Sequence, residues 1–119
     1  DPPLRKRFLG ITKPEKEAVL LRDARVIRDA VSIPLALVTG MRSIPVMEEV
    51  IRSGAADLIS MCRPLIREPN LIKRWKEGDS RPADCISCTS DAHKTLYGCF
   101  NPDETGKMHI YCRQLKKKS

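Results

Sequence analysis

Apolar residues recur along the first part of the chain with the spacing of a helix and then of buried strands. Over residues 20–31 they return every three or four positions, which predicts a helix with one buried face that includes Ile27 and Val31. Residues 35–39 and 57–62 are apolar runs without polar alternation, typical of parallel strands covered on both faces. Between these runs, Ser43 and Pro45 open a second predicted helix, and Gly54 ends it.

The same pattern continues to about residue 80. Arg63 and Pro64 open a short helical turn, and a longer helix follows Pro69, turns Leu71, Ile72 and Trp75 inward and stops at Gly78. The order helix–strand–helix–strand–helix with short connections predicts a parallel α/β unit. Because two parallel strands rarely form a stable sheet alone, we expect this unit to be a piece of a larger α/β fold.

The composition of the chain limits the classes of partner that we expect it to bind. The chain has 119 residues, enough for one ordinary domain, with 22 Lys and Arg against 15 Asp and Glu, a net charge of +7. The basic residues lie at both ends or alternate with acidic ones, and aromatics make up only 4%, so we expect no nucleic-acid partner. No apolar run approaches the roughly 18 to 20 residues of a membrane span, and no secretory leader is present, which predicts a cytoplasmic protein without a membrane partner.

Two predicted strand ends carry groups suited to an anion. Gly40 has no Cβ, so the backbone N–H groups of Gly40 and Met41 can approach a phosphate closely. Cys62 and Arg63 follow the second strand, and a guanidinium there supplies a bidentate cation. The alternative is that Gly40 only makes a turn and Arg63 pairs with Glu68. We expect Cys62 itself to be a buried, unreactive side chain.

Four of the five cysteines lie in the last 35 residues, which separates a body at residues 1–80 from an irregular tail at residues 81–119. Their spacing, Cys85-x2-Cys88 followed by Cys99 and Cys112, fits a four-thiolate metal site for zinc or an iron–sulfur cluster. Thiols that only pack are the alternative, and structural disulfides are disfavoured in a reducing compartment. His93 lies between the pairs and is a further ligand candidate, although an exposed loop position suits it better.

Two segments resemble a known family: VSIPLALVTGMRS at residues 31–43 and SGAADLISMCRPLIREP at residues 53–69. They are similar to the last third of the old yellow enzyme family, in its NADH:flavin oxidoreductase branch related to 2,4-dienoyl-CoA reductase. The resemblance implies the C-terminal fragment of a (β/α)8 TIM barrel, with two strands and their helices. It also implies an FMN-dependent reductase that uses NAD(P)H and a small-molecule acceptor. The hydride-transfer residues then lie outside this chain, and the chain alone is inactive.

Carried over by position, the resemblance makes Gly40, Met41, Cys62 and Arg63 the FMN phosphate site. It also makes the four tail cysteines ligands of a 4Fe–4S centre. The sequence departs from the family's pattern in three places. Thr39 stands where the family often has glycine, Cys62 stands where it has glycine or serine, and ten residues separate Cys88 from Cys99.

Two other interpretations stay open at this point. The chain could be a standalone four-cysteine metal-binding module with a basic surface, or a non-catalytic paralogue fragment. The sequence does not fix the acceptor, the choice between NADH and NADPH, the metal or the oligomeric state.

Overall fold

The structure, a computed structural model, describes residues 4–88 and 98–116. His93, a further ligand candidate, lies outside the described residues. The elements of the body are α1 (Leu4–Arg7), the 3-10 turn η1 (Pro14–Lys16), α2 (Leu21–Ala30), β1 (Ala36–Leu37), α3 (Ile44–Arg52), β2 (Leu58–Ile59), α4 (Arg63–Arg67) and α5 (Leu71–Lys76). The elements of the tail are β3 (Phe100–Pro102), β4 (Met108–Ile110) and α6 (Arg113–Lys116).

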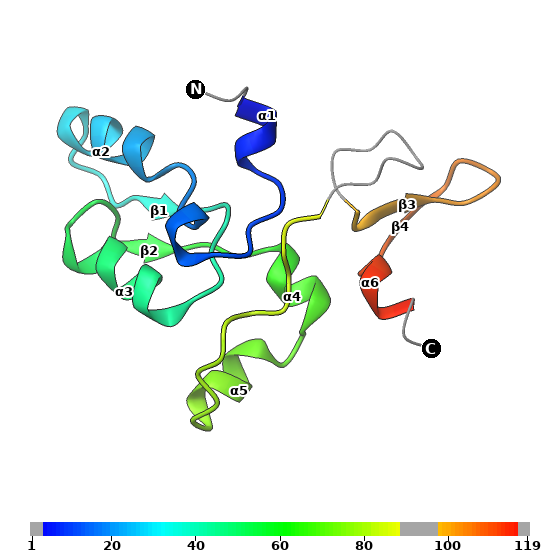
Figure 1. Cartoon of the computed structure of the whole chain (residues 1–119). Helices are drawn as coiled ribbons and strands as arrows, with labels where there is room; N and C mark the ends of the chain where they lie inside the picture. Colours follow the sequence, from blue (N-terminus) through cyan, green and yellow to red (C-terminus); the bar gives the residue numbers. More distant parts are fainter. Residues whose placement is uncertain (1–3, 89–97, 117–119) are drawn as a thin grey trace.

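The predicted parallel unit is confirmed, with shorter strands than expected. β1 pairs in parallel with β2, Ala36 opposite Leu58 and Leu37 opposite Ile59, and α3 connects them. In Figure 1, α2 lies above the two strands and α3 below them. Asp57 reinforces the pairing, because its Oδ2 accepts hydrogen bonds from the Leu35 N–H at 2.8 Å and from Arg28 at 2.7 Å.

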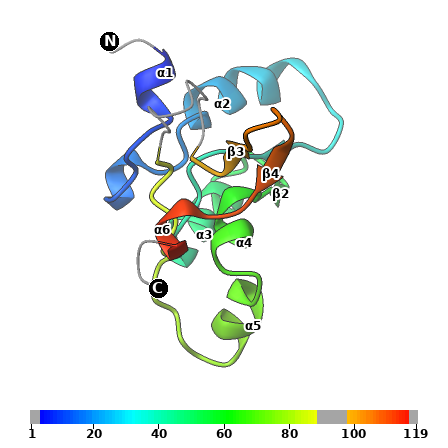
Figure 2. The ribbon, with the colours of Figure 1, turned by 90° about the vertical axis from the view of Figure 1, so that its right-hand side faces the viewer.

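The tail contains regular structure that the sequence analysis did not predict. β3 and β4 form an antiparallel hairpin, and Figures 1 and 2 show it with α6 at the far end of the molecule from α3. Asp103 organises the turn, since its Oδ1 accepts bonds from the N–H groups of Thr105 and Lys107, and Gly106 there adopts φ +85°. Each strand has only three residues, too few for a visible alternation of apolar and polar positions.

The core of the body gathers buried side chains of both helices and strands, Leu37, Met41 and Val50 among them. The strands, however, are not covered on both faces as predicted: Leu58 is 61% exposed. Ile27 and Ile72, predicted to point inward, are also about half exposed. The reason is the same in each case, because among the described residues no further strand or helix covers these faces.

The molecule is therefore mixed α/β with two small sheets of two strands each. Within residues 4–88 and 98–116 the strands do not close into a barrel. Among those residues no helix is long and apolar enough to cross a membrane.

Candidate anion-binding cavity

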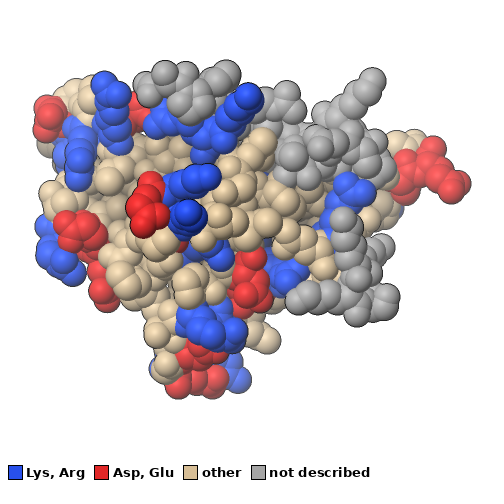
Figure 3. All heavy atoms as spheres, in the orientation of Figure 1, with Lys and Arg blue, Asp and Glu red and all other residues tan. Residues whose placement is uncertain are grey.

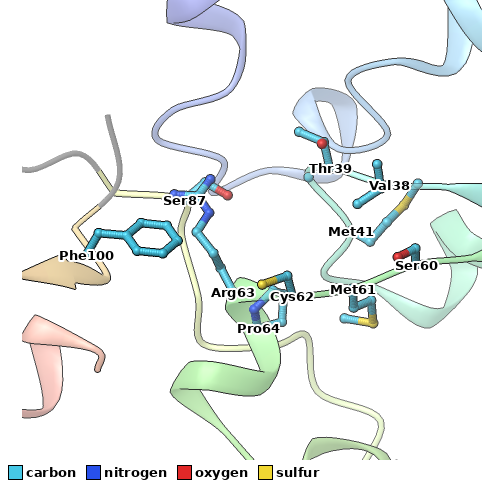
Figure 4. A pocket seen from close by; sticks show the side chains of 11 residues that line it. Val38, Thr39, Met41, Ser60, Met61, Cys62, Arg63, Pro64, Ser87 and Phe100 are labelled. Carbon is cyan, nitrogen blue, oxygen red and sulfur yellow. The ribbon is translucent and has the colours of Figure 1, made fainter. Parts of the chain in front are cut away.

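A cavity of about 220 Å³ opens where β1 and β2 end and α4 begins. All four residues predicted to hold a phosphate line it: Gly40, Met41, Cys62 and Arg63. The parallel pairing explains this convergence, since the carboxyl ends of parallel strands lie at one edge of the sheet. Figure 4 shows side chains from both strand ends and from the tail around the same space.

The loop after β1 approaches the cavity with its backbone. Gly40 adopts φ +78°, and an added Cβ would lie 2.8 Å from Val19 Cγ2 and 2.9 Å from Ile11 Cδ1. Glycine therefore suits both the left-handed conformation and the close packing behind the loop. The backbone N–H groups of Gly40 and Met41 donate no hydrogen bond to any residue that the structure describes. They are donors suited to an anion.

Glu17, which the sequence analysis missed, holds this loop from behind. Its carboxylate is buried and accepts bonds from the N–H groups of Arg42 at 3.0 Å and Ser43 at 2.9 Å, and from the Ser43 hydroxyl at 2.5 Å. Ser43 lies at the N-terminus of α3, and its hydroxyl binds Glu17 and makes no side-chain cap to that helix. The start of α3 therefore faces one of the protein's own carboxylates. An incoming anion would use the donors at residues 40 and 41.

Arg63 supplies the positive charge of the cavity. Its guanidinium donates to the carbonyl oxygens of Cys88 at 3.2 Å and Phe8 at 3.4 Å, which ties the start of α4 to the tail and to the N-terminal segment. Pairing with Glu68, the alternative interpretation, is wrong. Glu68 instead binds Arg74 at 2.9 Å.

The tail completes the wall of the cavity. Ser87 and Phe100 line it, and Figure 4 shows the Phe100 ring and Ser87 beside the Arg63 side chain. Neither residue could be found from the sequence, since Ser87 lies 28 positions after the end of β2 and Phe100 lies 63 positions after the end of β1. Ser87 adopts φ +55°, an uncommon conformation for a residue other than glycine.

Cys62 differs from its expected environment. It was predicted to be buried, yet it is exposed and lines the cavity next to Arg63. The physical reason is that β2 ends at Ile59, so Cys62 lies in the loop before α4 and not inside a covered strand.

The lining groups define what the cavity can do. It offers one guanidinium, backbone N–H donors and the hydroxyls of Thr39, Ser60 and Ser87, and its described lining contains no His, Asp, Glu or Lys. Such a set binds an anion and holds it in place. Apart from the Cys62 thiol, the described lining provides no side chain of the kinds that act in general acid–base catalysis at neutral pH.

The four tail cysteines lie near one another. Cys85, Cys99 and Cys112 are buried and Cys88 is partly buried, and all four are free thiols. Burial raises the pKa of the Cys99 thiol to about 11, opposed by the nearby positive charge of Arg63. Among the described residues, no group of three or more His, Cys, Asp or Glu is placed to hold a metal ion.

Comparison with known proteins gives two partial similarities. The chain is 30% identical over 77 residues to 4,4'-dithiodibutanoate disulfide reductase of Rhodococcus erythropolis, over 65% of this chain and 19% of that protein. It is 34% identical over 89 residues to imidazole glycerol phosphate synthase subunit HisF of Thermosynechococcus vestitus, over 73% of this chain and 30% of that protein. The chain thus spans less than a third of either relative. No family model matches it, and no solved structure matches it.

The first of these relatives is an oxidoreductase by name, so the chain shares sequence with an oxidoreductase over about two thirds of its length.

Proposed function

We propose that the cavity at the ends of β1 and β2 binds the phosphate group of FMN. One observation carries this proposal: the loop at Gly40 and Met41, whose N–H groups donate to no described residue, lies across one small cavity from Arg63. A phosphate needs several N–H donors and a positive charge, and this edge of the sheet offers both.

The size of the cavity agrees with an anchoring role. Pockets that enclose a whole drug-sized ligand have volumes of about 300 to 1,000 Å³, and this cavity, at about 220 Å³, is smaller. It suits one end of a larger cofactor. When bound, the flavin would supply the hydride chemistry, and these residues would fix its position through the phosphate.

The wider proposal follows from the resemblance and from the relatives. We infer that the chain is the C-terminal part of an FMN-dependent, cytoplasmic NAD(P)H oxidoreductase with a small-molecule acceptor and a TIM-barrel fold. The likeness to a disulfide reductase supports the reaction class. The name of the second relative includes imidazole glycerol phosphate, a compound with a phosphate group, which agrees with a phosphate site in this chain. The exposed face around Leu58 would be covered by the remaining strands of the barrel.

The metal-binding interpretation is kept as a separate prediction. The gathering of four thiols agrees with it, whereas their placement provides no set of three ligands for a metal.

The test removes the positive charge at Arg63. Arg63→Ala is expected to weaken FMN binding about tenfold or more, because a charge-assisted bond to phosphate contributes about 1.5 to 3 kcal/mol. The matched control is Arg52→Ala, which removes an exposed arginine of α3 that pairs only with Glu49 among the described residues. Binding is measured by the quenching of flavin fluorescence.

Arg63→Lys keeps a charge and loses the fork of donors, so it is expected to recover part of the affinity. Undiminished FMN binding by Arg63→Ala, with its circular dichroism spectrum intact, would remove the phosphate role from this residue.

A further inference from the structure

A second concave surface, separate from the cavity above, lies between α1, η1 and the start of α2. We call it the basic groove, with a volume of about 530 Å³. The lining residues are Lys6, Arg7, Leu9, Glu15, Lys16, Glu17, Ala18, Val19, Leu21, Arg22 and Arg25. Five are cationic and two are acidic, so the lining carries 5 − 2 = +3 charges. Figure 3 shows Lys and Arg gathered along the edge of the molecule formed by α1 and α2.

Most cations of this groove have no acidic partner. Some arginines elsewhere on the chain do lie against acidic groups, as Arg28 does with Asp57, Arg52 with Glu49 and Arg74 with Glu68. In the part of the chain that the structure describes, Lys6, Lys16, Arg22 and Arg25 make no ion pair. Like charges brought together in a concavity repel one another, and an anion placed between them relieves that repulsion.

The acidic residues of the groove do not cancel this charge. The Glu17 carboxylate is turned to the N–H groups of Arg42 and Ser43 and to the Ser43 hydroxyl. Glu15 is exposed on the 3-10 turn. A surplus of positive charge therefore faces the space of the groove.

The groove is also held in shape by the protein. Arg7 donates from Nη2 to the carbonyl oxygen of Val19 at 3.0 Å, which fixes α1 against the segment that forms the groove floor. Arg22 and Arg25 are three residues apart on α2, a spacing that places them on one face of the helix. Cations from three elements thus lie around one space.

The chemistry of the lining selects the kind of ligand. Among the described residues no aromatic side chain lines the groove and offers a platform for stacked bases, which argues against single-stranded nucleic acid. Its volume lies in the range of small-molecule sites, about 300 to 1,000 Å³. A terminal phosphate carries about −1.5 to −2 charges, so an organic diphosphate, with about three, matches the lining. Leu9, Ala18 and Val19 offer an apolar floor for the organic part.

We propose that the basic groove binds a small organic diphosphate, with the diphosphate held by the four cations that make no ion pair. This inference does not depend on FMN binding at the other cavity, because the two sites share no lining residue.

The test uses inorganic pyrophosphate as the probe, with calorimetric titration of the purified protein. The double variant Arg22→Gln/Arg25→Gln is expected to bind pyrophosphate at least about tenfold more weakly, because it loses two charge-assisted contacts. Arg52→Gln is the matched control and is expected to bind like the unmodified protein, since Arg52 lies on α3 and lines no part of the groove. Sulfate, with fewer charges, is expected to bind at least about tenfold more weakly than pyrophosphate.

Arg63→Ala separates this proposal from the proposed function. If pyrophosphate binding falls with Arg63→Ala and not with the double variant, the groove proposal is wrong and the anion site lies at the other cavity. If no variant changes the affinity, or if pyrophosphate does not bind at all, the groove proposal is also wrong. Because Arg22 and Arg25 are exposed, their removal is expected to leave the circular dichroism spectrum unchanged.

Discussion

Single residues determine whether the loop after β1 can hold an anion. Gly40 allows the close packing of that loop, Glu17 holds it from behind, and Arg63 supplies the charge across the cavity. Two of these three could be predicted from the sequence, because glycine and arginine at strand ends are recognisable. Glu17 could not. It lies in a charged segment, and only the folded chain shows that its carboxylate turns inward to Ser43.

Replacing Gly40 tests the packing behind the loop. Gly40→Ala is expected to lower the free energy of unfolding by about 3 kcal/mol, since it combines left-handed backbone strain with a clash against Val19 and Ile11. Gly54→Ala is the matched control: Gly54 has a similar φ of +75°, and its added Cβ meets nothing within 4 Å. It should cost only about 1 to 2 kcal/mol. Urea denaturation of both variants gives the comparison, and equal losses would contradict the clash.

Replacing Glu17 tests the support of the loop. Glu17→Ala is expected to lower the free energy of unfolding by about 3 kcal/mol, because it leaves the buried donors of Arg42 and Ser43 without their acceptor. Glu17→Gln keeps an acceptor and should recover part of this loss. Thermal unfolding measures both. Equal melting temperatures for Glu17→Ala and the unmodified protein would show that the carboxylate does not stabilise the loop.

The thiols are expected to differ in reactivity. Cys62 is exposed, whereas Cys99 is 4% exposed and burial raises its pKa to about 11, so almost none of it is thiolate at neutral pH. Alkylation with iodoacetamide, followed by mass spectrometry, should label Cys62 first and Cys99 much more slowly. Added phosphate should slow the labelling of Cys62, which lines the cavity. A Cys99 that reacts as fast as Cys62 would contradict the described burial.

At the scale of elements, the short parallel pair creates the site, because it brings two strand ends to one edge. The order of helices and strands followed from the apolar spacing, and the pairing followed from that order. The strand lengths did not follow from the apolar spacing. An apolar run forms a strand covered on both faces only when other elements pack against both faces, and Leu58 lies uncovered. The hairpin of the tail was missed because its three-residue strands are too short to show a period.

The ionisation of Asp57 makes the stability of the folded state, which includes the pair of β1 and β2, depend on pH. Its pKa is lowered by the hydrogen bond from the Leu35 N–H and then by Arg28, so the folded state favours the ionised form. The resulting stabilisation is present above the unfolded pKa of about 4 and is lost as the pH falls through the lower folded value. Asp57→Asn is thus expected to be less stable than the unmodified protein at pH 7 and to approach it near pH 2. Thermal unfolding across this range checks it, and a constant difference would contradict the assignment.

At the scale of the whole molecule, the described residues form a mixed α/β unit joined to a cysteine-bearing tail. The tail takes part in the candidate site, since Ser87 and Phe100 contribute to the wall of the cavity and Arg63 binds the Cys88 carbonyl. The division near residue 80 stays a prediction from the distribution of cysteines. The packing of the tail against the strand ends could not be predicted, because contacts between residues far apart in the chain leave no recognisable pattern in a single sequence.

The central claim, that the cavity holds the phosphate of FMN, is tested most directly by comparing FMN with riboflavin, which lacks only the phosphate. The measurement is an NMR titration that follows the backbone amide signals of Gly40 and Met41. FMN and inorganic phosphate are both predicted to shift these signals, and riboflavin at the same concentration is predicted to leave them unchanged. Equal shifts with FMN and riboflavin, or no shift with FMN, would contradict the claim.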